Sequence, residues 1–252
     1  MALFDMYNRV MVTKIKRAIY ACDIGSTRYQ KKRRGPNFGW ARLNPNEGTK
    51  SIRGSSDIQQ LVEQLQRDIE AGYSVSLGFE SPLFIPIPDN SEELSKGRQG
   101  DGDRSWAAPQ GAGVTTLGIH QSAWVLKRLH ESSSGKCEFT LDWKCWPPTS
   151  HQHILFCWEA FVSGKDAHSV DDMRDAATAV VFFFDNERNL QLVNAVKTEK
   201  PISLIGAVAL WSGWTSDLMY LHNRTTLVLK PSSVFEGEIQ GVSQDSSNRR
   251  SP

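Results

Sequence analysis

The sequence predicts an α/β fold in which one mixed β-sheet carries helices on both faces. Three observations predict it. Short apolar runs bounded by turn residues alternate with segments of helical periodicity. The first three strand-like runs follow one another directly, which is typical of an antiparallel meander. Later strands follow helices, and a strand after a helix normally pairs in parallel through a right-handed crossover. We therefore expect five strands in the order 3-2-1-4-5.

The first three strands are expected close to the N-terminus. Residues 18–26 (AIYACDIGS) form an apolar run that ends in a turn-prone Asp-Ile-Gly-Ser. Residues 38–43 (FGWARL) form the second strand, which the Asn-Pro-Asn turn at 44–46 closes. Residues 50–53 form a weaker third strand. A polar and basic hairpin connects the first two strands.

A helix and a fourth strand follow the meander. Residues 57–71 place apolar side chains at helical spacing, with Ser56 or Asp57 as the N-cap and Gly72 at the C-terminal end. Residues 74–80 (SVSLGFE) then form a buried strand that ends in Glu80.

The second half of the chain supplies the remaining elements. Residues 81–116 are long, irregular and rich in Gly and Pro, which is usual for functional or disordered loops. We expect helices at 116–131 and 171–184 and a fifth strand at 153–161. In domain terms, the sequence predicts an N-terminal extension (1–17), one domain (18–231) and a flexible, Ser-, Asn- and Arg-rich tail (232–252).

Composition limits the classes of function. The 252 residues carry a formal net charge of +1, so a nucleic-acid partner would have to bind a local basic patch. No apolar run reaches the roughly 18 residues of a membrane span, so we expect no membrane partner. The four cysteines suggest no disulfide framework, which leads us to expect a cytoplasmic location. Cys137, Cys145, His151 and His153 offer a zinc site in principle, but the sequence has no C-x-x-C pair.

Acidic residues occur where core elements begin or end. Asp23 lies within the first strand, Glu80 ends the fourth, and Asp172 and Asp175 open the last helix. Neighbouring parallel strand ends converge at one edge of a sheet, and residues three apart share one helix face. The small residues Ala176 and Ala179 would let that helix approach the sheet. We expect these four carboxylates to bind Mg²⁺ or Mn²⁺, because several oxygen ligands around two ions are what metal-assisted phosphodiester hydrolysis requires.

Each of these acids also has a structural explanation. Asp23 is a common turn former before Gly25. Glu80 precedes Ser-Pro and would fit a solvated strand end. Asp171 and Asp172 would favour the dipole at a helix N-terminus, an explanation that weakens for Asp175, one turn further in.

The order of these motifs resembles the RNase H-like nuclease superfamily. The Asp172-Met-Arg-Asp175-Ala176 segment looks like the late helix of RuvC-type resolvases. The Glu80-Ser-Pro-Leu segment, followed by Gly97-Arg98 and Asp103-Arg104, is similar to a bacterial family of predicted RNase H-like nucleases, which also carries an Asp-Asp-x-x-Asp-Ala motif. The resemblance implies a hydrolase with Asp23, Glu80, Asp172 and Asp175 as catalytic metal ligands.

Two other classes of function remain open. The Asp23-Ile-Gly25-Ser-Thr27 turn also resembles the phosphate-binding turn of actin-like and pantothenate-kinase-like phosphotransferases, where backbone amides meet phosphate. The third class is a non-catalytic nucleic-acid-binding module.

Basic side chains in two loops are candidate contacts for DNA or RNA. Arg28, Arg33 and Arg34 lie in the first hairpin and suit phosphate binding, although the same residues would fit a solvated turn. Arg98 and Arg104 lie in the long loop after Glu80, near Trp106. His120 and His168 are possible proton shuttles.

Overall fold

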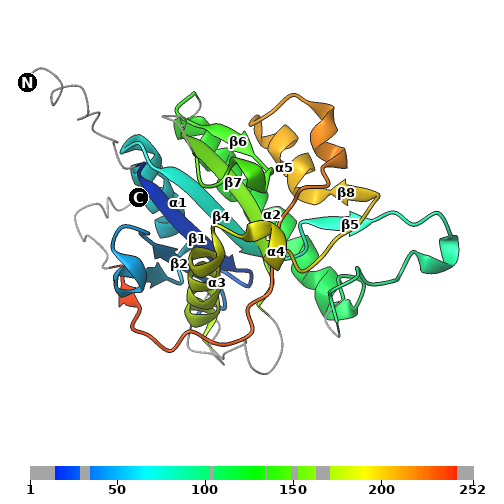
Figure 1. Ribbon diagram of the computed structural model, residues 1–252, viewed down its shortest axis with the longest axis horizontal. Helices are drawn as coiled ribbons and strands as arrows, with labels where there is room; N and C mark the ends of the chain where they lie inside the picture. Colours follow the sequence, from blue (N-terminus) through cyan, green and yellow to red (C-terminus); the bar gives the residue numbers. More distant parts are fainter. Residues whose placement is uncertain are drawn as a thin grey trace, which may run out of the picture.

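The computed structural model describes six segments of the chain, 15–28, 35–102, 105–133, 135–148, 153–162 and 171–242. Within them the α/β fold is confirmed: a mixed sheet lies between helices (Figure 1). The described strands form an eight-stranded sheet of order β10-β3-β2-β1-β4-β7-β6, with β9 paired to β7, and a separate two-stranded sheet of β5 and β8.

The elements have the following bounds. The strands of the main sheet are β1 (Arg17–Asp23), β2 (Gly39–Leu43), β3 (Arg53–Ser55), β4 (Ser74–Glu80), β6 (Glu138–Thr140), β7 (Ile154–Ala160), β9 (Val228–Leu229) and β10 (Gln240–Gly241). The small sheet contains β5 (Phe84–Pro86) and β8 (Pro201–Ser203). The α-helices are α1 (Ile58–Glu70), α2 (Pro109–Ser133), α3 (Asp172–Asn186), α4 (Leu190–Val193) and α5 (Leu204–Ser212). Short 3-10 helices are η1 (Gly48–Ser51), η2 (Ser91–Glu93), η3 (Trp143–Cys145) and η4 (Leu218–His222).

The pairing directions follow from the connections. β1, β2 and β3 form an antiparallel meander. β4 follows α1 and pairs in parallel with β1, and β7 pairs in parallel with β4. Asp57 is the N-cap of α1, where its side chain accepts a hydrogen bond from the backbone N–H of Gln59. Four of the five expected strands are present where the sequence predicted them. The third lies at Arg53–Ser55 rather than at 50–53, because Gly48–Ser51 form the 3-10 helix η1. The expected count of five is wrong, because β6, β9 and β10 extend the sheet.

The alternation of side chains along β1 divides the core into two layers. Ala18, Tyr20 and Cys22 face one side, where α1, α2 and α5 pack. Ile19 and Ala21 face the other side, where α3 packs. In Figure 1, α3 lies on the opposite face of the sheet from α1 and α5. None of the helices in the described segments is long and apolar enough to cross a membrane.

Two further segments differ from the sequence-based prediction. Helix α2 begins at Pro109, seven residues before the expected start at 116. Residues 232–242, expected to belong to a flexible tail, instead cross α3 and end in β10. The cause is specific bonding: Arg174 Nη1 donates to the carbonyl of Phe235, and the backbone N–H of Phe235 donates to Thr178 Oγ1.

A buried ionic network fastens α1 to the meander. The guanidinium of Arg42 on β2 pairs with Asp68 on α1, with Nε 2.7 Å from Oδ2, and the hydroxyl of Tyr20 on β1 donates to the same carboxylate oxygen at 2.5 Å. Burial, followed by the charge of Asp68, raises the pKa of the Tyr20 phenol well above its usual value. The network therefore contains one buried cation, one carboxylate and a phenol that stays protonated.

We predict that Asp68→Ala lowers the free energy of unfolding by about 3–5 kcal/mol, because it leaves the buried Arg42 cation without its carboxylate. Urea denaturation measures the change. The matched control is Glu63→Ala on the same helix, whose carboxylate pairs with Arg67 at 3.9 Å on the surface and should cost less than about 1 kcal/mol. Equal losses for the two variants would contradict a structural role for the network.

Candidate metal centre

Two acidic residues end neighbouring parallel strands. Asp23 is the last residue of β1 and Glu80 the last residue of β4, and the register of the two strands places them opposite each other. Since side chains alternate along a strand, Asp23 shares the face of Ile19 and Ala21, on which α3 packs. The adjacency expected for Asp23 and Glu80 is therefore confirmed.

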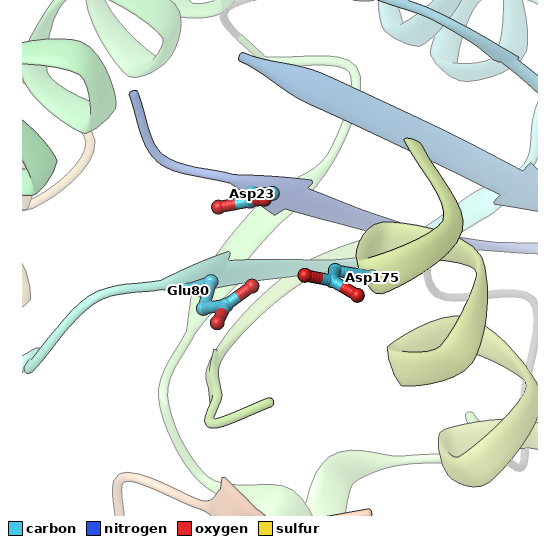
Figure 2. Close-up of side chains that lie close together, drawn as sticks. All are labelled: Asp23, Glu80 and Asp175. Carbon is cyan, nitrogen blue, oxygen red and sulfur yellow. The ribbon is translucent and has the colours of Figure 1, made fainter. Parts of the chain in front are cut away.

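Helix α3 brings a third carboxylate to these strand ends. Asp175 lies in the first turn of α3 and is fully buried, with 0% of its surface exposed. Asp23, Glu80 and Asp175 each offer a carboxylate oxygen, and these oxygens lie within 4.8 Å of one another. Figure 2 shows the three side chains converging from β1, β4 and α3. Among the described residues, this is the one group of three or more acidic, His or Cys side chains arranged to hold a metal ion.

A glycine on β2 permits the close approach of α3. Gly39 is the register partner of Asp23, and a Cβ atom built on it would lie 2.4 to 2.6 Å from the backbone of Asp172 and Met173. Real Cβ atoms essentially never come that close to other atoms, so only glycine fits here. Ala176 and Ala179 on α3 are each 1% exposed and lie in the same core layer, as their small size predicted.

Asp171 and Asp172, the two other acids at the start of α3, lie outside the group of three carboxylates. Asp171 is exposed and serves as the N-cap, where Oδ1 accepts a hydrogen bond from the backbone N–H of Met173 at 3.1 Å. Asp172 is partly exposed and lines a pocket beside the cluster, but it is not one of the three acids whose oxygens lie within 4.8 Å of one another. Asp172 therefore lines the pocket beside Asp23, Glu80 and Asp175 without belonging to that group of three.

That pocket has a volume of about 250 Å³. Its acidic side is formed by Asp23, Glu80 and Asp172. The remaining wall comes from the strand ends and from the start of α2, namely Ile24, Asn37, Ser81, Pro82, Ser105, Ala108, Gln110, Gly111, Val114, Phe161 and Val162. A small substrate group can therefore reach the carboxylates from this side, while Asp175 closes the cluster from the interior.

The chain leaving Glu80 is held by a second buried ionic network. The guanidinium of Arg98 contacts both oxygens of Glu159 on β7, at 2.8 and 2.6 Å, and also pairs with Asp101 at 2.9 Å. Glu159 Oε2 in turn accepts a hydrogen bond from the backbone N–H of Leu83. Burial alone would lower the pKa of Arg98, but Glu159 and then Asp101 raise it, so the cation is retained.

This network contradicts the expectation that Arg98 binds substrate. Its side chain and that of Glu159 are each 1% exposed, and its donors are directed to Asp101, Glu159 and the carbonyl of Phe84. Because the buried Arg98 guanidinium already donates to these internal partners, it cannot also bind a substrate phosphate. The role of Arg98 is to anchor the long loop to the sheet beside Glu80.

The other basic candidates are only partly placed. Arg28 is exposed at the end of the segment that follows Asp23. Arg33, Arg34 and Arg104 lie outside the described residues, as does His168, while His120 is exposed on α2.

Of the residues that offer a zinc site in principle, Cys137, Cys145 and His153 do not form a ligand group. Burial raises the pKa of the Cys137 thiol to about 12, which disfavours the thiolate that zinc requires. Cys145 and His153 are exposed and form no ligand group with Cys137, and His151 lies outside the described residues. Cys22 and Cys157 are core residues, and their burial raises the pKa of each thiol.

The turn after Asp23 is already bonded within the fold. The backbone N–H of Ser26 donates to Asn37 Oδ1 at 2.7 Å, and Gln121 Nε2 donates to the carbonyl of Gly25. A Cβ on Gly25 would lie 1.6 Å from the carbonyl oxygen of Asn37. The amide of Ser26 is therefore engaged by a side chain, which disfavours the phosphate-binding turn of the phosphotransferase alternative.

Comparisons with known proteins give no assignment: no family model matches the chain, and no curated protein or solved structure is significantly similar to it.

Several residues that shape the site escaped the sequence analysis. Gly39 lies against the backbone of α3. Asn37 and Gln121 bond to the turn that follows Asp23. The one local signal was that Gly39 lies within a predicted strand, and such a glycine often marks a close approach of another backbone.

We predict that Gly39→Ala lowers the free energy of unfolding by about 1–3 kcal/mol, because the new methyl group forces α3 away from β2. Displacing α3 also moves Asp175, so, if the three carboxylates hold a metal ion, the affinity for Mn²⁺ should fall in the same variant. Urea denaturation and calorimetric Mn²⁺ titration measure the two effects. Gly241→Ala on β10 is the control, since its Cβ would meet no atom within 4 Å. If Gly39→Ala behaved like this control, the packing argument would fail.

Proposed function

We propose that this protein is a metal-dependent nuclease that hydrolyses phosphodiester bonds in DNA or RNA. The observation that carries the proposal is the convergence of Asp23, Glu80 and Asp175 from two adjacent strand ends and a helix, with their oxygens within 4.8 Å of one another. Asp172 lines the pocket that opens beside them.

The donor set fits Mg²⁺ or Mn²⁺. Carboxylate oxygens are the ligands that these hard cations prefer. Bonds of about 2.1 Å place opposite ligands of one ion about 4.2 Å apart, so small side-chain movements suffice to bring the three oxygens onto a common ion. Three carboxylates at this spacing repel one another, and a divalent cation removes that repulsion.

Each residue then has a defined task. Asp23, Glu80 and Asp175 hold the cation, and Asp172 supplies a further oxygen on the pocket side, for a second ion or for a bound water. Two such ions, when bound, activate water and stabilise the leaving oxygen of an in-line displacement. The carboxylates act as ligands and form no covalent bond to the substrate. The Arg98–Glu159 pair keeps the backbone after Glu80 in place.

The arrangement of strands supports the likeness to RNase H-like nucleases. Within the larger sheet, β3, β2, β1, β4 and β7 are consecutive neighbours, and α3 packs on the face that carries Asp23 and Glu80. β6, β9 and β10 are additions to that five-strand arrangement.

The proposal predicts Mg²⁺- or Mn²⁺-dependent cleavage of at least one member of a panel of single-stranded, duplex, hybrid and junction substrates. Asp23→Asn and Asp175→Asn should each reduce cleavage at least about 100-fold while leaving the fold intact, because each removes a ligand charge at nearly constant shape. Labelled oligonucleotides measure cleavage, and circular dichroism checks the fold.

The matched control is Asp171→Asn, which can still cap α3 and should cleave like the wild type. A parallel assay follows ATP turnover. ATP consumption without nucleic-acid cleavage would assign the protein to the phosphotransferase alternative. If neither reaction occurred and oligonucleotides still bound, the non-catalytic module would replace the nuclease.

A further inference from the structure

A second pocket lies apart from the carboxylates and has the opposite charge. Its volume is about 290 Å³, close to the lower end of the range of about 300–1,000 Å³ for small-molecule sites. Lys197 and Arg224 contribute two cations to its lining, and none of the described residues that line it is acidic. Within the described segments, neither cation forms an ion pair, and both are exposed. An anionic group is the ligand that this charge favours.

The pocket also offers an aromatic surface. Trp143 from η3 is partly exposed in its wall, whereas Phe84 is 3% exposed and Val196 is 1% exposed, so these two form a closed apolar floor. Lys144 Nζ lies 5.9 Å from the centre of the Trp143 ring and adds a third cation nearby. A flat ring beside several cations suits a base stacked on the indole with its phosphate on the cations.

The polar wall of the pocket is held in place by internal bonds. Asn194 Oδ1 accepts a hydrogen bond from the backbone N–H of Val228 at 3.0 Å. Asn223 Oδ1 accepts one from the backbone N–H of Thr225, whose hydroxyl donates to the carbonyl of Leu141. With its oxygen engaged, Asn194 has its amide NH₂ left as a donor, suited to the edge of a base. A preformed wall lowers the entropy cost of binding.

One small apolar cluster contributes side chains to the walls of both pockets. Phe84, Val196 and Val228 form this cluster, and Phe161 packs against it. Phe84 lines the basic pocket, and Phe161 lines the pocket beside the carboxylates.

We propose that the basic pocket binds one nucleotide unit, with its phosphate on Lys197 and Arg224 and its base against Trp143. The unit is either a free nucleotide or one residue of a nucleic-acid strand. This site shares no lining residue with the pocket beside the carboxylates and needs no metal. Nucleotide binding there can therefore be tested independently of the nuclease activity.

The test measures binding to the full-length protein in EDTA. Calorimetry with a nucleoside monophosphate and with inorganic phosphate forms one arm, and fluorescence anisotropy with a labelled single-stranded oligonucleotide forms the other. Trp143→Ala should weaken binding of the monophosphate at least about 5-fold through lost stacking. The Lys197→Ala/Arg224→Ala double variant should weaken it at least about 10-fold and reduce the salt dependence of binding.

The matched control removes two exposed cations elsewhere, Arg67→Ala/Arg128→Ala, and should bind like the wild type. Asp23→Asn should also bind normally, which separates this site from the carboxylates. Oligonucleotide binding that is lost in the same variants identifies a strand as the source of the nucleotide, and binding of the monophosphate alone identifies a free nucleotide. Phosphate binding as tight as the nucleotide, an unaffected Trp143→Ala, or equal losses in the control would each overturn the proposal.

Discussion

The close contact between α3 and the antiparallel half of the sheet is the constraint on which the site depends. Gly39 lies against the backbone of Asp172 and Met173, so any side chain at position 39 would separate the helix from β1 and β2. Because the helix sits this close, its first turn carries Asp175 directly to the ends of β1 and β4. The sheet register fixes Asp23 against Glu80, and the helix contact supplies the third carboxylate.

Two buried ionic networks hold the elements on either side of that contact. The Arg42–Asp68 pair joins β2 to α1, and the Arg98–Glu159 pair joins the loop after Glu80 to β7. Buried pairs of this kind add little net stability compared with apolar residues, but breaking one of them is costly. Their effect is to fix the positions of the elements around the site. β1 and β4, which carry Asp23 and Glu80, lie in the sheet between β2 and β7, and each of these two outer strands holds one ionic network. Rigid supports of this kind suit a metal site, whose ligands must be held in place before the ion binds.

The sequence predicted those parts of the site that depend on local pattern. Acids at the ends of apolar strands placed Asp23 and Glu80 correctly, and the helical spacing placed Asp175 on α3. The sequence could not separate Asp175 from Asp172, since which face of a helix meets the sheet depends on tertiary packing. Arg98 was misassigned because its partner Glu159 is 61 residues away. The strands β9 and β10 were missed because two residues carry no periodicity.

The central claim is that the three convergent carboxylates form a metal site, and a crystal grown with Mn²⁺ tests it most directly. Anomalous scattering locates manganese without reference to any assumed ligand. We predict a peak bonded to oxygens of Asp23, Glu80 and Asp175 at about 2.0–2.2 Å, the range expected for small divalent cations with oxygen ligands, and we predict that Asp175→Asn abolishes it. A map with no peak among these carboxylates at millimolar Mn²⁺, or with manganese bound only elsewhere, would contradict the account.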